Sequence, residues 1–159
     1  MVRAPRLHRG GRGFEACTVH MKIVTSSEKE TFELAKRLAK KARGGEVYAL
    51  SGNLGAGKTV FVRGFAAGLG IKHNVNSPTF VLMKIYPVKK HKTLKHLCHI
   101  DAYRLKSARD LAAIGALDYF GKKDAVCFVE WPKNVKKILK NITTIKIMQK
   151  SETKRTIEI

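Results

Sequence analysis

Acidic residues are scarce in this chain of 159 residues. It contains 12 Asp and Glu against 32 Lys and Arg, which gives a net charge of +20. Such an excess of positive charge fits a polyanionic partner such as RNA, because opposite charges attract at long range. Solvated lysines without any partner would produce the same composition, so the net charge leaves both interpretations open.

Cysteines and long apolar runs are scarce as well. Cys17, Cys98 and Cys127 lie far apart and form no C-x-x-C pair, which is typical of reduced thiols and predicts a cytoplasmic protein. No apolar stretch approaches the length of a membrane span, so we expect no membrane partner. With 44% hydrophobic residues the chain can still bury a core, which favours one globular domain.

The first 20 residues differ in composition from the rest. They contain four arginines and no apolar periodicity, and they lack both a hydrophobic stretch for a secretory signal and the serines of a transit peptide. We therefore expect residues 1–20 to be a basic, disordered extension. Residues 21–159 would form the folded domain, with Met21 as a candidate start of the protein.

Residues 52–59 match the full phosphate-binding pattern G-x-x-x-x-G-K-T. The glycines let the backbone bring successive N–H groups onto phosphate oxygens, the lysine reaches the β- and γ-phosphates, and the threonine hydroxyl can ligate magnesium. The phosphates also lie at the positive end of the helix that follows. The predicted nucleotide-binding residues are Gly52, Asn53, Leu54, Gly55, Ala56, Gly57, Lys58 and Thr59.

The segments around this loop have the order of strand, loop and helix. Residues 46–50 form a short, mostly apolar run, and apolar residues recur at helical spacing from Phe61 to Leu69, before Gly70. An ordinary glycine-rich turn would not require these flanking elements. The sequence therefore predicts a single P-loop NTPase domain of the α/β class.

Other segments supply further strands and helices. A capping box of Ser27 and Glu30 predicts the start of a helix that residues 44–45 end, and Ser107 caps a short helix through Ile114. Strands are expected at 22–24, 80–86, 94–100, 126–129, 143–148 and 156–159, and a helical turn at 135–139. The second and third of these strands form a long hairpin, and the last two form a closing one.

Two carboxylates stand at the ends of predicted strands, Asp101 and Glu130. Ligands of open α/β sheets bind at the carboxyl ends of strands, so each acid is a candidate to hold magnesium directly or through water, or to orient the attacking water. With Lys58 they form the predicted catalytic set, and with Thr59 the predicted metal ligands. The alternative for each acid is a strand-end cap or a surface residue.

Two further sets of residues have more than one functional interpretation. Ser77 and Thr79 could place a hydroxyl near the γ-phosphate, as switch segments do, or could form an ordinary turn. His96, Cys98 and His99 suggest a metal site, but strand alternation puts the first two on one face and His99 on the other. No second ligand pair appears in the sequence, which disfavours zinc.

Several motifs follow one another in a specific order. They are the glycine loop, Ser77-Pro78-Thr79-Phe80, His99-Ile100-Asp101-Ala102-Tyr103-Arg104-Leu105, Ile114-Gly115 and Glu130-Trp131-Pro132. From about Thr31 to Ile159 the chain resembles the bacterial tRNA threonylcarbamoyladenosine biosynthesis ATPase family, TsaE. Many families share the glycine loop, whereas the D-x-Y-R and E-W-P segments in this order are much more specific.

The resemblance implies an ATP-binding domain with a mixed sheet flanked by helices, and ATP and Mg²⁺ as cofactors. It implies a role in forming threonylcarbamoyladenosine beside the anticodon of tRNA, together with a TsaD-type transferase and its TsaB-like subunit. The transferase, not the ATPase, would transfer the carbamoyl group, and the basic surface could contact tRNA. By position, Asp101 would act at the metal and Glu130 at metal or water. Trp131 would lie near the nucleotide, and Thr79 would be the switch hydroxyl.

The chain departs from the family pattern at Asn53, where an acidic residue is usual, and at Asn76, where a hydroxyl residue is common. Neither departure removes a phosphate or metal ligand. The main alternative is a P-loop kinase of a small metabolite, which would need an arginine-bearing lid that we do not see. A GTPase would need N-K-x-D, and a basic RNA-binding module would use its nucleotide only for regulation. We expect Arg104 to pair locally with acids rather than to act as an arginine finger.

Overall fold

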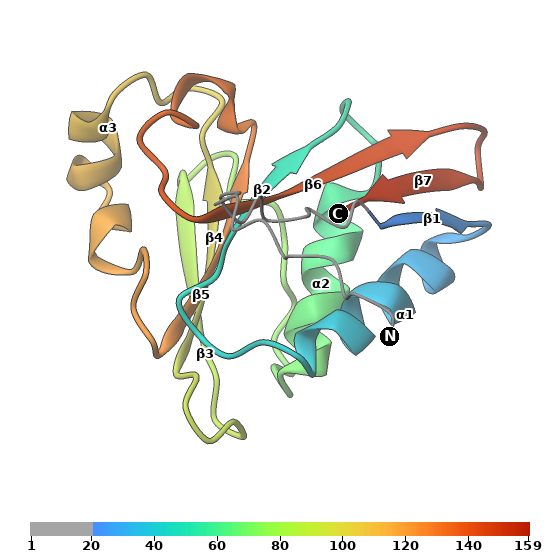
Figure 1. Cartoon of the computed structure of the whole chain (residues 1–159), viewed down its shortest axis with the longest axis horizontal. Helices are drawn as coiled ribbons and strands as arrows, with labels where there is room; N and C mark the ends of the chain where they lie inside the picture. Colours follow the sequence, from blue (N-terminus) through green and yellow to red (C-terminus); the bar gives the residue numbers. More distant parts are fainter. Residues whose placement is uncertain (1–20) are drawn as a thin grey trace, which may run out of the picture.

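A computed structural model describes residues 21–159 of the chain as a mixed sheet flanked by helices (Figure 1). The predicted extension, residues 1–20, lies outside the described residues. The strands are β1 (Lys22–Thr25), β2 (Val47–Ser51), β3 (Met83–Pro87), β4 (His96–Asp101), β5 (Ala125–Glu130), β6 (Ile142–Gln149) and β7 (Arg155–Glu158). The helices are α1 (Glu28–Ala39), α2 (Lys58–Gly68) and α3 (Ala108–Ala113), with short 3-10 turns η1 (Ala116–Asp118) and η2 (Pro132–Asn134).

The seven strands lie in the order β1-β7-β6-β2-β5-β4-β3. The four central strands, β6, β2, β5 and β4, run parallel, whereas β3, β7 and β1 pair antiparallel with their neighbours. The predicted mixed α/β sheet is therefore confirmed, and so are the hairpins β3–β4 and β6–β7. Because the central strands are parallel, their carboxyl ends meet at one edge of the sheet, where α/β proteins bind ligands.

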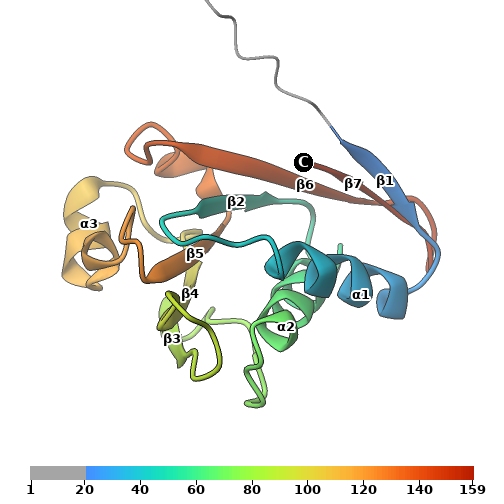
Figure 2. The same ribbon diagram turned by 60° about the horizontal axis from the view of Figure 1, so that its bottom comes forward.

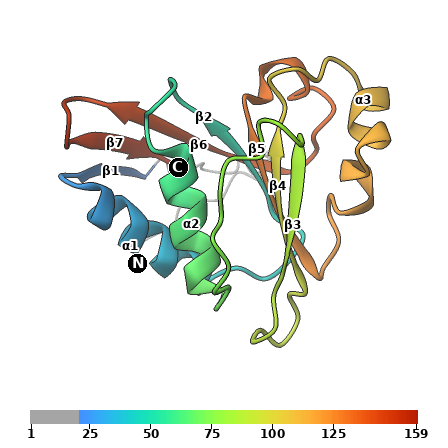
Figure 3. The ribbon, with the colours of Figure 1, turned by 180° about the vertical axis from the view of Figure 1, so that it is seen from behind.

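Helices cover the two faces of this sheet unequally. Helices α1 and α2 pack side by side on one face, and α3 lies on the other, beside β4 and β5 (Figures 1 and 3). The aromatic side chains of Phe61, Phe65 and Phe128 fill the core under α2. A second core, which includes Ile100 and Leu111, lies beneath α3. Buried side chains on both faces hold β4 and β5 rigidly, and these are the strands that end in Asp101 and Glu130.

Helix α1 starts as predicted but ends earlier. The Ser27 hydroxyl accepts from the backbone N–H of Glu30 at 3.1 Å, while the Glu30 carboxylate accepts from Ser26, not from Ser27. The helix stops at Ala39 rather than at residues 44–45. The reason lies in the following connection, where the Glu46 carboxylate accepts hydrogen bonds from two backbone N–H groups and holds a non-helical turn.

The start of β3 also differs from the prediction. Strand β3 begins at Met83 and not at Phe80, because the backbone N–H groups of Val81 and Leu82 donate to the carbonyl of Pro78 and form a turn. The helical turn expected at 135–139 is confirmed, because the N–H groups of Ile138 and Leu139 donate to the carbonyl of Val135, and η2 precedes it. Within residues 21–159, no helix is both long and apolar enough to cross a membrane.

Candidate active site

The glycine loop joins the carboxyl end of β2 to the first turn of α2, as the pattern predicts. Gly52 and Gly57 have φ values of +151° and +107°, and a Cβ on Gly52 would lie 2.4 Å from the carbonyl oxygen of Ile147. Both positions therefore require glycine. The N-cap residue of α2 is Gly57, and in the described part of the chain no side-chain hydrogen bond caps this helix. Its first N–H groups can therefore take an anionic ligand, which fits a phosphate group.

Lys58 is the buried cation of the site. Its Nζ atom donates to the carbonyls of Gly52 at 2.9 Å and Asn53 at 3.0 Å, and it lies 4.1 Å from the ring centroid of Trp131. Burial lowers the pKa of the Lys58 ammonium, and the carboxylates of Glu130 and Asp101 oppose that shift. The side chain is thus a positive charge at the glycine loop, with both predicted acids close enough to influence it.

Asp101 and Glu130 lie side by side. They are the last residues of β4 and β5 and face each other in the register of this parallel pair. Both side chains are buried, and an oxygen of Asp101 accepts from the backbone N–H of Tyr103 at 2.9 Å. The structure therefore brings the two predicted acids together with Lys58. Thr59 follows Lys58 in the first turn of α2.

These residues fit a magnesium ion that is also held by a nucleotide. Within residues 21–159, no group of three or more His, Cys, Asp or Glu side chains could hold a metal ion by itself. Magnesium usually keeps several water ligands and is bound through one or two carboxylates plus substrate phosphates. The two neighbouring carboxylates provide such a partial set of oxygen ligands. Thr59, in the first turn of α2, is the predicted hydroxyl ligand.

His99 belongs to this site, although the sequence suggested it only as a weak metal-ligand candidate. Its Nε2 atom lies 2.7 Å from Oε1 of Glu130, and because a carboxylate only accepts, Nε2 is the donor. The imidazole is fully buried, and among the described residues its Nδ1 atom has no partner. A detectable signal existed, since strand alternation puts His99 on the same face as Asp101.

Arg155, at the start of β7, is a second residue that sequence reasoning missed. Its buried side chain donates from Nε to the carbonyl of Ala56 at 3.2 Å, and it lies 3.6 Å from the Glu28 carboxylate. The Arg155 side chain therefore stabilises the position of the glycine loop through this hydrogen bond. Nothing in the local sequence could reveal this contact, because the two partners are 99 residues apart.

The predicted switch residue Thr79 lies on the surface. Its hydroxyl is 2.8 Å from that of Ser77, and its carbonyl accepts from the Arg104 guanidinium. The expectation that Arg104 pairs with acids is thus wrong, because its described hydrogen bond goes to a backbone carbonyl. None of these described bonds joins Thr79 to the glycine loop. Arg104 instead ties the Ser77–Thr79 segment to the chain that follows Asp101.

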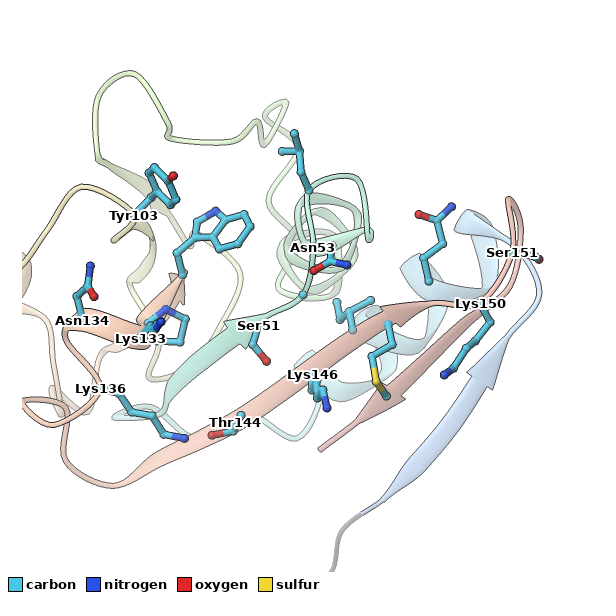
Figure 4. A pocket seen from close by; sticks show the side chains of 17 residues that line it. Ser51, Asn53, Tyr103, Lys133, Asn134, Lys136, Thr144, Lys146, Lys150 and Ser151 are labelled. Atoms are coloured by element: carbon cyan, nitrogen blue, oxygen red, sulfur yellow. The ribbon is translucent and has the colours of Figure 1, made fainter.

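Trp131 follows Glu130 directly and borders a large cavity. The cavity has a volume of about 1270 Å³ and reaches from residues 51–54, past Tyr103 and Trp131, along β6 (Figure 4). The rings of Tyr103 and Trp131 meet edge to face, with centroids 5.6 Å apart. Trp131 thus touches both the buried Lys58 and the open space beside the loop.

The family model described as "Threonylcarbamoyl adenosine biosynthesis protein TsaE" matches residues 25–157. The chain belongs to the TsaE family. The resemblance seen in the motifs is therefore confirmed.

Individual TsaE proteins support this assignment. The chain is 37% identical to the tRNA threonylcarbamoyladenosine biosynthesis protein TsaE of Treponema pallidum over 141 residues, which covers 87% of this chain and 99% of that protein. It is 43% identical to the Bacillus subtilis protein of the same name over 112 residues, 70% of this chain and 66% of that protein. The fold matches a crystal structure of YdiB from Bacillus subtilis with a TM-score of 0.69 and 34% identity, covering 87% of this chain and 83% of that one.

Proposed function

We propose that this chain binds Mg²⁺-ATP at the glycine loop and hydrolyses it in support of threonylcarbamoyladenosine formation in tRNA. The relatives carry this modification in their names. The observation that carries the ATPase part of the proposal is the register of β4 and β5, which sets Asp101 beside Glu130 and near the buried Lys58. An ATPase needs a cation at its phosphate-binding loop and carboxylates nearby that hold magnesium or orient the attacking water.

Each residue has a chemical role in this proposal. The N–H groups of the loop and of α2 bind the phosphate oxygens, and Lys58 adds a positive charge where negative charge develops. Thr59, Asp101 and Glu130 would hold magnesium, which supplies charge neutralisation at the phosphates. Glu130 also orients the attacking water. Trp131, in contact with Lys58, would lie near the nucleotide.

We further propose that the chain acts with a TsaD-type transferase and its TsaB-like subunit. Two large apolar side chains near the site are strongly exposed: Leu54 at 89% and Phe80 at 95%. Apolar groups gathered at one place on a surface mark an interaction site. A partner that covered them would exclude water and fix the Ser77–Thr79 segment, and a site completed in trans can gain ~10³-fold in rate.

Phosphate release is the experiment that tests this proposal. We expect slow ATP hydrolysis by the chain alone and a large acceleration by the transferase and its TsaB-like subunit. Fast hydrolysis by the chain alone, at a rate that the partners do not change, would refute the partner-dependent mechanism. Transfer of phosphate to a metabolite would identify a kinase instead. Restoration of threonylcarbamoyladenosine in cells that lack their own ATPase of this type would test the biological role.

His99 acts in this proposal as a positioning residue for Glu130. Replacing it by phenylalanine removes the donor at 2.7 Å from Oε1, and we expect kcat for the partner-stimulated ATPase to fall about 10-fold, with ATP affinity unchanged. His99→Gln keeps an N–H donor and should recover part of the rate. Cys98→Ala is the matched control, because Cys98 is equally buried on the opposite face of β4.

A double-mutant cycle separates positioning from general damage to the fold. If His99 acts through Glu130, adding His99→Phe to Glu130→Gln should produce no further loss of kcat. Additive losses, or an equal loss in Cys98→Ala, would show that His99 only stabilises the strand.

A further inference from the structure

One face of β6 carries mostly polar and basic side chains, with Met148 among them. Ile145 and Ile147 point into the core with α1 and α2, and the alternate residues Thr144 and Lys146 therefore point to the opposite face. Thr144, Lys146 and Lys150 lie along this strand beside the cavity (Figure 4). Figure 2 shows α1 and α2 beneath the sheet, and no helix among the described residues covers the other side of β6.

The cavity beside this strand is strongly basic. Four lysines line it. Lys133 belongs to η2 and Lys136 follows it, whereas Lys146 belongs to β6 and Lys150 follows that strand. Among residues 21–159, neither Asp nor Glu lines the cavity. The neighbouring acid, Glu158, faces Lys146 across the β6–β7 pair, but it also lies 3.8 Å from Lys22. The acid is thus shared between two lysines, and the groove keeps a net positive charge.

The dimensions and chemistry of this groove suit a polyanion longer than one nucleotide. Its volume of about 1270 Å³ exceeds the range of roughly 300–1,000 Å³ that is typical of small-molecule sites. Lys146 and Lys150 are separated by about 13 Å along an extended chain, so they can contact different phosphates. Tyr103, which is 68% exposed at one end of the groove, offers an aromatic ring on which an unpaired base of RNA can stack.

We propose that the groove formed by Lys133, Lys136, Lys146 and Lys150 binds the phosphate backbone of an RNA loop. The proposal rests on the proposed function in one respect, since RNA is the substrate of the modification. The lysines would make sequence-independent contacts with phosphates, and Tyr103 would hold an unstacked base. RNA bound there would lie next to the glycine loop, because residues 51–54 form one wall of the same cavity.

The test compares two double variants of the full chain that remove equal charge. Lys146→Ala with Lys150→Ala changes the groove, and Lys89→Ala with Lys90→Ala changes exposed lysines in the β3–β4 connection. Binding of a labelled RNA hairpin is followed by fluorescence anisotropy over a range of salt concentrations. We expect the groove variant to lose affinity about 10-fold or more at low salt, and the slope of log affinity against log salt to become shallower by about 2. The control should keep both values.

ATP affinity and thermal stability are measured on the same variants, and both should be unchanged. These measurements separate the two proposals. If the chain without substitutions does not bind ATP, the nucleotide site is refuted, and the measured RNA affinities still test the groove. Equal losses of RNA affinity in both double variants would overturn the groove and indicate unspecific attraction. Unchanged RNA affinity together with lost binding to the transferase would assign the groove to a protein partner and also overturn it.

Discussion

Replacing Lys58 by alanine is expected to weaken Mg²⁺-ATP binding by about 10- to 150-fold, which corresponds to a charged hydrogen bond of roughly 1.5–3 kcal/mol. The ammonium is buried against two loop carbonyls and the Trp131 ring. Burial lowers its pKa, and the nearby charges of Glu130 and Asp101 oppose that shift and favour the charged form. Without it, these carboxylates would repel the phosphates. Isothermal titration calorimetry measures the change directly.

Two further variants make this result specific. Lys58→Met keeps the aliphatic part of the side chain in its buried position and removes only the charge, so it should lose ATP affinity like the alanine variant. Lys72→Ala removes an exposed lysine beyond the end of α2 and should bind ATP normally. Unchanged affinity in both Lys58 variants would mean that the glycine loop does not bind the phosphates.

Glu130→Gln and Asp101→Asn should each reduce the turnover of ATP far more than its binding. We expect kcat to fall by about 10²–10⁴-fold for Glu130→Gln, the range for loss of a general base or water-orienting group. These substitutions keep the shape of two buried side chains at the ends of β4 and β5 and remove only their negative charge. Interactions that act mainly in the transition state change kcat, whereas uniform binding changes affinity.

Magnesium dependence distinguishes the roles of the two acids. A variant that lost a metal ligand should recover part of its rate at high magnesium, and a variant that lost the water-orienting group should not. The measurement is single-turnover phosphate release with the transferase and the TsaB-like subunit present. Either variant hydrolysing ATP at the normal rate would remove that acid from the proposed catalytic set.

The sequence predicted the parts of the site that depend on local patterns. The glycine loop, the helix after it and the acid at the end of each strand could be located because strand and helix periodicities are short-range properties. That β4 and β5 are neighbours in register is a property of the whole sheet, and no local pattern contains it.

The predictions that were wrong also concern contacts that the tertiary structure determines. Residues 80–82 have strong strand propensity, but hydrogen bonds to the Pro78 carbonyl form a turn instead. Arg104 was expected to pair with acids near it in the sequence, and it reaches Thr79 because folding brings a distant carbonyl closer. Local charge patterns identify residues that are able to form a bond, whereas tertiary structure selects the partner.

The bond between Arg155 and Ala56 also has a consequence for synthesis of the protein. The loop precedes its support by 99 residues, which at about 5–20 residues per second takes a ribosome roughly 5–20 s to add. Strand β2 likewise lies between β5 and β6, which are both made later. A nascent chain with a complete glycine motif therefore lacks the side chain that holds the loop in shape. If the glycine loop binds nucleotide as proposed, we expect a nascent chain to gain this ability only after β7, with Arg155, has been made.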